Sequence, residues 1–139
     1  MTNDRHNENQ QRLYKLRKSE ILRGYNKFSE VFSHGNSFDA RTIKVFVLVQ
    51  KDKAPALLVG FAVSRSVRRA VDRNRAKRLL REAYRHYKHL LLDVVKENKL
   101  SLSLVFIAKS SNIKQLSLHT IEDDMKVLFK QISTQHFVV

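Results

Sequence analysis

The densest chemical feature of this sequence is a run of basic side chains in residues 65–88. The run holds ten lysines and arginines against two acids, so it carries a net charge of +8 out of the +14 of the whole chain. Charge of one sign at this density repels itself, and a polyanion is its natural partner. Arginine predominates, and its planar guanidinium binds phosphate oxygens in pairs and stacks on bases. The run therefore predicts binding to nucleic acid, with Arg65, Arg68, Arg73, Asn74, Arg75, Lys77, Arg78, Arg81 and Arg85 as candidate contacts.

Three phenylalanines offer a second kind of contact. Phe28, Phe32 and Phe46 could form a platform on which unpaired bases stack. Their rings are equally suited to a hydrophobic core, so the pattern alone leaves both roles open. Asn74 adds an amide that is able to read a base edge beside phosphate ligands. Because the sequence contains no helix-turn-helix, zinc-finger or basic-zipper pattern, these features favour single-stranded or structured RNA over DNA.

The sequence gives the chain no nuclease chemistry of its own. A protein nuclease needs clustered carboxylates for metal ions, or a paired acid and base. Its acids are scattered instead, and Glu122, Asp123 and Asp124 fit the first turn of a last helix that Ser117 or Thr120 would cap. His86 and His89 are three residues apart on a helix, but no partner has metal-ligand spacing. We therefore expect neither a catalytic residue nor a metal site in the protein.

Length and composition indicate one folded domain. The chain has 139 residues, 42% of them hydrophobic, and no cysteine. The polar residues 1–12 are expected to form a disordered arm, which leaves 13–139 as a single RNA-binding domain. These first residues do not resemble a signal peptide, and no apolar run approaches the roughly 18 residues that span a bilayer. We expect a cytoplasmic protein with no membrane partner.

Hydrophobic periodicity predicts the elements that must position these side chains. A helix is expected over 19–31, with Gly24 inside it and Gly35 or Asn36 as a left-handed cap. Residues 43–50 and 56–64 are expected to pair as antiparallel strands. A long helix follows from Val67 or Ala70 to about 97, then a strand over 102–108 and a helix over 117–132. The order describes an α+β, two-layer sandwich whose mostly antiparallel sheet has its helices on one side.

The long helix sorts into two faces at about 100° per residue. One face is almost entirely cationic, and the other carries the apolar side chains that would pack on the sheet. Most charge runs are merely solvated surface, and an anionic membrane surface is a further alternative. An ordinary solvated face mixes both signs of charge, however, which favours contact with nucleic acid here. The basic face contains Arg73, Asn74, Lys77, Arg78, Arg81, Arg85 and Lys88, the apolar face Ala76, Leu79, Leu80, Ala83, Tyr87 and Leu90, with Tyr84 at the boundary.

Three blocks of the sequence resemble the protein subunit of bacterial ribonuclease P. They are F-S-E-V-F-S-H-G-N-S at 28–37, V-G-F-A-V-S at 59–64, and A-V-D-R-N-R-A-K-R-L-L-R-E-A-Y-R at 70–85. The third block, with its Arg-Asn-Arg core and the following K-R-x-x-R-E, is highly specific. The resemblance extends over about 16–132, which is nearly the whole chain.

This resemblance implies a ribonucleoprotein endonuclease that removes the 5′ leader from precursor tRNA. In that family the RNA subunit performs the hydrolysis with bound Mg²⁺, and the protein alone is inactive. The resemblance places Arg73, Asn74, Arg75, Lys77, Arg78 and Arg81 on or beside the contact with the catalytic RNA. It places Phe28, Phe32 and Phe46 in a cleft for the single-stranded leader. It also implies a fold like domain 2 of ribosomal protein S5, with a left-handed βαβ crossover against the usual hand.

Two segments depart from the family pattern. The family has Ser-Lys-Lys-Val-Gly before the long helix, where this chain has S-R-S-V-R at 64–68, so Arg68 replaces a glycine. Residues 86–100 are longer than the family pattern, which extends the helix or adds a loop. The rival interpretation from another class is a structural or ribosomal RNA-binding protein with no part in cleavage.

Overall fold

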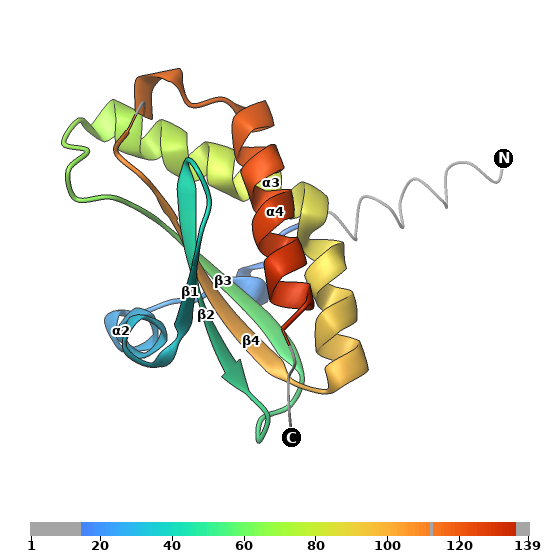
Figure 1. The fold of residues 1–139 in the computed structure, drawn as a ribbon. Helices are drawn as coiled ribbons and strands as arrows, with labels where there is room; N and C mark the ends of the chain where they lie inside the picture. Colours follow the sequence, from blue (N-terminus) through green and yellow to red (C-terminus); the bar gives the residue numbers. More distant parts are fainter. Residues whose placement is uncertain (1–14, 112, 136–139) are drawn as a thin grey trace, which may run out of the picture.

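The computed structural model describes residues 15–111 and 113–135. They form an α+β fold, as expected, with one sheet between helices (Figure 1). The expected division into an arm at 1–12 and a domain at 13–139 stays a prediction, because the arm lies outside the described residues. The elements are a 3-10 turn at Lys18–Glu20, α2 at Tyr25–His34, β1 at Asn36–Asp39, β2 at Ile43–Gln50, β3 at Ala56–Val63, α3 at Ala70–Asn98, β4 at Ser101–Ala108, a 3-10 turn at Ile113–Gln115 and α4 at Leu118–Ser133.

The first helix starts later than its periodicity predicted. Gly24 lies at its N-terminus rather than inside it, with a φ of 91° that side chains with a Cβ rarely adopt. The helix ends at Gly35 in an extended conformation, so the predicted left-handed cap is wrong. Asn36 instead opens β1, a short strand that its polar sequence did not reveal. Ile21 and Leu22, which the periodicity assigned to the helix, lie in the segment before it.

The strands are arranged in the order β1-β2-β4-β3. β1 pairs with β2 and β2 with β4, both antiparallel, while β3 pairs with β4 in parallel. The predicted antiparallel pair of 43–50 and 56–64 is therefore wrong, because β4 lies between these two strands. The expectation of a mostly antiparallel sheet is confirmed. The connector 51–55 joins strands that are neighbours in sequence but not in the sheet. A local sequence pattern does not show whether two consecutive strands pair directly or are separated by a third strand.

Helices cover both faces of the sheet. α3 and α4 pack on one face, against Val45, Val59 and Phe106 among others, as expected. α2 lies against the opposite face, where Leu22, Val31 and Val105 form a smaller buried cluster (Figure 1). The expectation that all helices share one side therefore holds for α3 and α4 and is wrong for α2. The cause is the extended segment before α2, which leads the chain to the other face.

The long helix α3 is continuous over 29 residues, from Ala70 to Asn98. Residues 86–100 therefore extend the helix, and Lys99 ends it in the left-handed conformation with a φ of 51°. On its predicted apolar face, Ala76, Leu80 and Ala83 are buried, while Leu79 and Tyr87 are partly buried. Tyr84, predicted at the boundary, is fully buried. Leu90, predicted on the buried face, is 43% exposed. α3 connects β3 to β4, which are parallel neighbours in the sheet.

The last helix begins as predicted, since Ser117 Oγ accepts a hydrogen bond from the Thr120 N–H. Glu122, Asp123 and Asp124 were predicted in its first turn, which contains no acid, so this prediction is wrong. Asp124 accepts a hydrogen bond from the Thr42 N–H at 2.7 Å and ties the helix to the start of β2. Across the described part of the chain, none of the helices has both the length and the apolar character required to traverse a bilayer.

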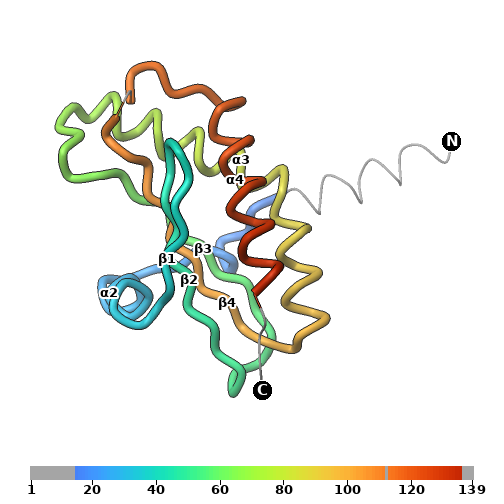
Figure 2. The backbone as a smooth tube through the Cα atoms, viewed as in Figure 1, coloured from blue at the N-terminus to red at the C-terminus, as the bar shows by residue number. Residues whose placement is uncertain are grey.

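The segment before α2 lies along the outer edge of β3. The Leu22 N–H donates to the Val59 carbonyl at 2.8 Å, and Ile21 forms a parallel bridge with Val59. Figure 2 shows this backbone, in blue, beside the green β3 on its way to α2. The segment thereby brings its own basic residues next to α3.

Candidate nucleic-acid interface

The exposed side of α3 carries four of the nine predicted contacts. Asn74, Lys77, Arg78 and Arg81 are all exposed, and residues spaced by three and four lie on one face of a helix. Arg65 and Arg68, in the turn before α3, are exposed as well. Within the described residues, none of these cations forms an ion pair with a carboxylate. This part of the predicted basic surface therefore faces solvent with its charge uncompensated.

The two arginines that flank Asn74 lie differently, because both bind backbone carbonyls of the protein. Arg73 donates from Nη1 to the Ser64 carbonyl at 3.0 Å and to the Val67 carbonyl at 2.8 Å. Arg75 donates from Nη2 to the Leu116 carbonyl, just before α4. Each guanidinium has five N–H donors, so both retain donors for phosphate. The Arg73 side chain thus stabilises the turn that contains Arg65 and Arg68, and the Arg75 side chain stabilises the loop before α4.

A basic cleft continues this surface toward the N-terminal segment. It has a volume of about 820 Å³ and contains Arg81 and Arg85 of α3 together with Lys15, Lys18 and Arg23. The guanidinium of Arg81 lies 6.0 Å from the ring centroid of Phe61 on β3. Sequence reasoning missed the three N-terminal cations. Their density in residues 15–23 was a signal, but only the pairing of this segment with β3 places them beside α3.

Lys88 does not belong to the exposed basic face. Its side chain is 3% exposed, and its Nζ lies 3.0 Å from a carboxylate oxygen of Glu20 and donates to the Lys15 carbonyl. The helical wheel placed it with the cations, because the wheel does not include the segment that covers this turn of α3. Through these contacts Lys88 instead holds the N-terminal segment, which forms one wall of the basic cleft.

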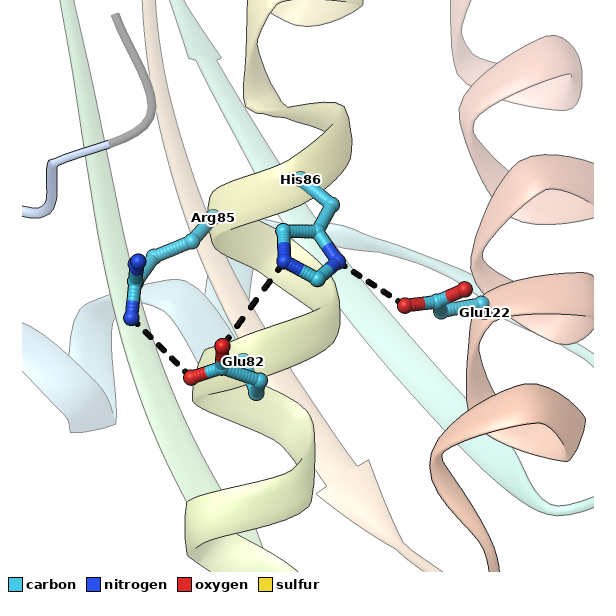
Figure 3. A network of polar contacts seen from close by, with 4 residues as sticks. All are labelled: Glu82, Arg85, His86 and Glu122. Atoms are coloured by element: carbon cyan, nitrogen blue, oxygen red, sulfur yellow. Dashed lines mark hydrogen bonds and ion pairs between the residues drawn. The ribbon is translucent and has the colours of Figure 1, made fainter. Parts of the chain in front are cut away.

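His86 lies between two carboxylates, one on α3 and one on α4. Its Nδ1 is 2.9 Å from Glu122 Oε1 on α4, and its Nε2 is 3.7 Å from Glu82 Oε1 one turn earlier on α3. Glu82 also pairs with Arg85 at 3.0 Å (Figure 3). This network joins α3 to α4 and accounts for one of the two predicted helix histidines. No group of three or more His, Asp or Glu within residues 15–111 and 113–135 is arranged to hold a metal ion.

Phe28, Phe32 and Phe46 do come together, on the α2 side of the sheet. The centroids of Phe28 and Phe32 are 6.3 Å apart, and Phe32 meets Phe46 edge-on at 5.1 Å. Phe32 is 40% exposed, while Phe28 and Phe46 are half-buried. The Lys44 ammonium lies 5.2 Å from the centroid of Phe46. Phe28 packs on the sheet and Phe32 exposes part of its ring to solvent, and the stacking of bases on this cluster stays a prediction.

Comparison with known proteins assigns the chain to a family. The family model described as Ribonuclease P matches residues 16–133. The chain belongs to the ribonuclease P protein family. As a member of this family, it is the protein component of a ribonucleoprotein enzyme that processes tRNA, and not a structural ribosomal protein.

Curated relatives agree with this family. The ribonuclease P protein component of Clostridioides difficile is 35% identical over 104 residues, which cover 75% of this chain and 83% of the relative. That of Porphyromonas gingivalis is 39% identical over 101 residues, covering 70% and 73%.

Solved structures share the fold. The ribonuclease P protein of Staphylococcus aureus superposes with a TM-score of 0.65 at 22% identity, over 83% of this chain and 96% of that one. The protein from Thermotoga maritima superposes with a TM-score of 0.63 at 22% identity, over 81% and 96%. The α+β fold predicted from the sequence is therefore the fold of ribonuclease P proteins.

Proposed function

We propose that the exposed face of α3 binds the catalytic RNA of ribonuclease P and that the aromatic cluster of Phe28, Phe32 and Phe46 binds the single-stranded 5′ leader of precursor tRNA. The RNA subunit hydrolyses the phosphodiester bond, and the protein contributes charge and position. The working compartment is the cytoplasm, where precursor tRNA is made in bacteria.

The observation that carries this proposal is the uncompensated charge on α3. Lys77, Arg78 and Arg81 are exposed, and none has a carboxylate partner within the described residues. Phosphates of two RNA molecules repel one another when they are close, and cations between them reduce this repulsion. The cations therefore increase the affinity of the RNA molecules for one another, and the increase is smaller at high salt. A protein that binds the RNA subunit and the precursor tRNA at the same time holds them in position, which lowers the entropic cost of the reaction.

The aromatic cluster offers rings on which unpaired bases can stack. Stacking on an aromatic side chain is tolerant of sequence, which suits a leader that differs between precursors. Phe32 exposes part of its ring for this contact, and Lys44 beside Phe46 supplies a cation for the backbone phosphate. Mature tRNA lacks the leader, so this surface would distinguish substrate from product.

Magnesium ions belong to the RNA in this proposal. Within residues 15–111 and 113–135, no three carboxylates or histidines are grouped to hold a metal ion. Such an ion prefers one or two carboxylates together with phosphate oxygens and water. The ion would polarise the scissile phosphate, and the cations of α3 would help the RNA to fold around its metal sites at low Mg²⁺.

The contact with the catalytic RNA is tested by assembly with a bacterial ribonuclease P RNA at several salt concentrations. Arg78→Ala and Arg81→Ala should each weaken assembly and reduce the magnitude of the slope of log affinity against log salt by about 1. Lys130→Ala, an exposed lysine on α4, is the matched control and should leave the slope unchanged. Unchanged slopes for both arginine variants would exclude α3 as the RNA face.

The leader contact is tested in the reconstituted holoenzyme at low Mg²⁺. Phe32→Ala should weaken binding of precursor tRNA by about fivefold to a hundredfold, which is the range for loss of one stacked base, and leave mature tRNA binding unchanged. Ser33→Ala, exposed on the same helix, is the control. An equal loss for precursor and mature tRNA would contradict a leader site at this cluster.

A further inference from the structure

The N-terminal segment, residues 15–23, is attached to the body of the protein at two places. Its first part contacts α3, where the Lys88 ammonium donates to the Lys15 carbonyl and pairs with the Glu20 carboxylate at 3.0 Å. Its last part follows the outer edge of β3 and leads into α2. Through Lys88, the position of the segment is therefore tied to the helix that carries the exposed basic face.

The burial of Lys88 is unusual, because lysine is almost never fully buried unless it is paired. Its side chain is 3% exposed. Both of the groups that accept hydrogen bonds from its ammonium belong to the N-terminal segment. A buried ion pair contributes little net stability compared with apolar side chains of similar size. Stability alone is thus a poor reason for a lysine here, whereas a fixed position for the segment is a good one.

In this position the segment places three cations opposite α3. Lys15, Lys18 and Arg23, the segment cations, line the basic cleft of about 820 Å³ together with Arg81 and Arg85 of the helix. The segment cations are exposed, and none of them pairs with a carboxylate within residues 15–111 and 113–135. Cations on the two walls of a cleft repel one another, and a polyanion between the walls removes that repulsion.

We infer that Glu20 and Lys88 are positioning residues for RNA binding, which hold the segment cations across the cleft from α3 so that both walls contact one stretch of RNA backbone. The RNA is the catalytic RNA, because the cleft continues the exposed face of α3 through Arg81. The inference rests on the proposed function. Lys88 is too deeply buried to reach the RNA, and the Glu20 carboxylate repels phosphate. Both residues therefore act through the segment.

This role and a simple effect of charge predict opposite results for Glu20→Gln. The variant removes a negative charge beside the cleft, so charge alone would strengthen the binding of RNA. Positioning predicts weaker binding, because the segment loses its ionic attachment to Lys88. Lys88→Met removes no exposed cation, so any change in the number of phosphate contacts must come from movement of the segment.

The experiment measures assembly of the full chain with a bacterial ribonuclease P RNA at several salt concentrations. Lys18→Ala and Arg23→Ala should each reduce the magnitude of the slope of log affinity against log salt by about 1. Glu20→Gln should weaken assembly and reduce the slope by about 2, because it displaces several cations at once. Adding Lys88→Met to Glu20→Gln should cause no further reduction. Lys130→Ala, exposed on α4, is the control.

A loss of folding is separated from movement of the segment in two ways. Circular dichroism at the assay temperature confirms that each variant is folded before RNA is added. Glu20→Asp keeps a carboxylate for Lys88 and should keep most of the wild-type slope, whereas Glu20→Gln should not. The segment cations make no side-chain ion pair within the described residues, so their alanine variants test the cleft with little effect on stability.

The outcomes also separate this inference from the proposed RNA face. If Arg78→Ala reduces the slope while Glu20→Gln and the variants of the segment cations keep the wild-type slope, the inference is wrong and the RNA face of α3 stands. Tighter assembly of Glu20→Gln would overturn the inference as well, because Glu20 would then act by its charge. If Arg78→Ala and Arg81→Ala both keep the wild-type slope, the RNA face itself is wrong, and the inference is rejected with it.

Discussion

The ring of Phe28 lies directly over Gly60, so that a Cβ on this glycine would be 2.5 Å from Cζ of Phe28. This contact explains why two blocks far apart in the sequence belong together. Phe28 comes from the first helix and Gly60 from the middle of β3, and α2 can approach the sheet only because the glycine has no side chain. The aromatic cluster of Phe28, Phe32 and Phe46 depends on that close approach.

Gly60→Ala should therefore destabilise the protein. A strand glycine that faces open space gains about 0.5–1 kcal/mol when alanine replaces it. Here the added methyl group displaces the Phe28 ring, and overpacking costs about 1–3 kcal/mol. Urea denaturation should show the loss, and adding Phe28→Leu should recover part of it. A stability equal to or above that of the wild type would contradict this account of the contact.

Replacing Glu20 should lower the stability of the protein more than replacing Lys88. Glu20→Gln leaves the buried Lys88 ammonium without its carboxylate, which should lower the free energy of unfolding by about 2 kcal/mol. Lys88→Met removes the buried charge and leaves Glu20 more accessible to water, so the loss should be smaller. Lys96→Met, exposed on the same helix, is the control for urea denaturation. A larger loss of stability for Lys88→Met than for Glu20→Gln would contradict the pairing of a buried Lys88 ammonium with Glu20.

The Arg73 side chain should contribute to folding, and the Arg78 side chain should not. Arg73→Ala removes two hydrogen bonds to the carbonyls of Ser64 and Val67 and should cost about 1.5–3 kcal/mol of stability. Arg78→Ala changes an exposed side chain and should stay within about 0.5 kcal/mol of the wild type. Thermal melts measure both variants without RNA. Equal stabilities would mean that Arg73 does not hold the turn.

Burial raises the pKa of Tyr84 above its ordinary value of 10.0, with a smaller contribution from the charge of Glu20. The unfolded chain loses this proton near pH 10 while the folded protein keeps it, so the unfolded state binds fewer protons and stability falls as the pH rises. Each pH unit above 10 should cost about 1.4 kcal/mol from this group.

Urea midpoints at pH 8 and pH 11 measure this effect. Tyr84→Phe should lose less stability between the two values than the wild type does. Tyr25→Phe, whose ring is 85% exposed, should lose as much as the wild type. An identical loss in the wild type and in Tyr84→Phe would show that Tyr84 is not protected from ionisation in the folded protein.

The sequence by itself determined the elements whose signal is local. The long helix, three of the four strands and the Ser117 cap follow from periodicity and capping residues that act over a few positions. The cationic face of α3 is equally local, since the spacing of Asn74, Arg78 and Arg81 along one helix fixes their common direction. Three sequence blocks were also enough to indicate the family.

Only the tertiary structure decided which parts of the chain meet. Insertion of β4 between β2 and β3, the position of α2 on the far face, and the burial of Lys88 by Glu20 all depend on contacts between distant residues. The same is true of the cleft that Lys15, Lys18 and Arg23 share with α3. The physical reason is that burial and charge pairing depend on distances in space, whereas a sequence pattern reports only the direction of a side chain from its own element.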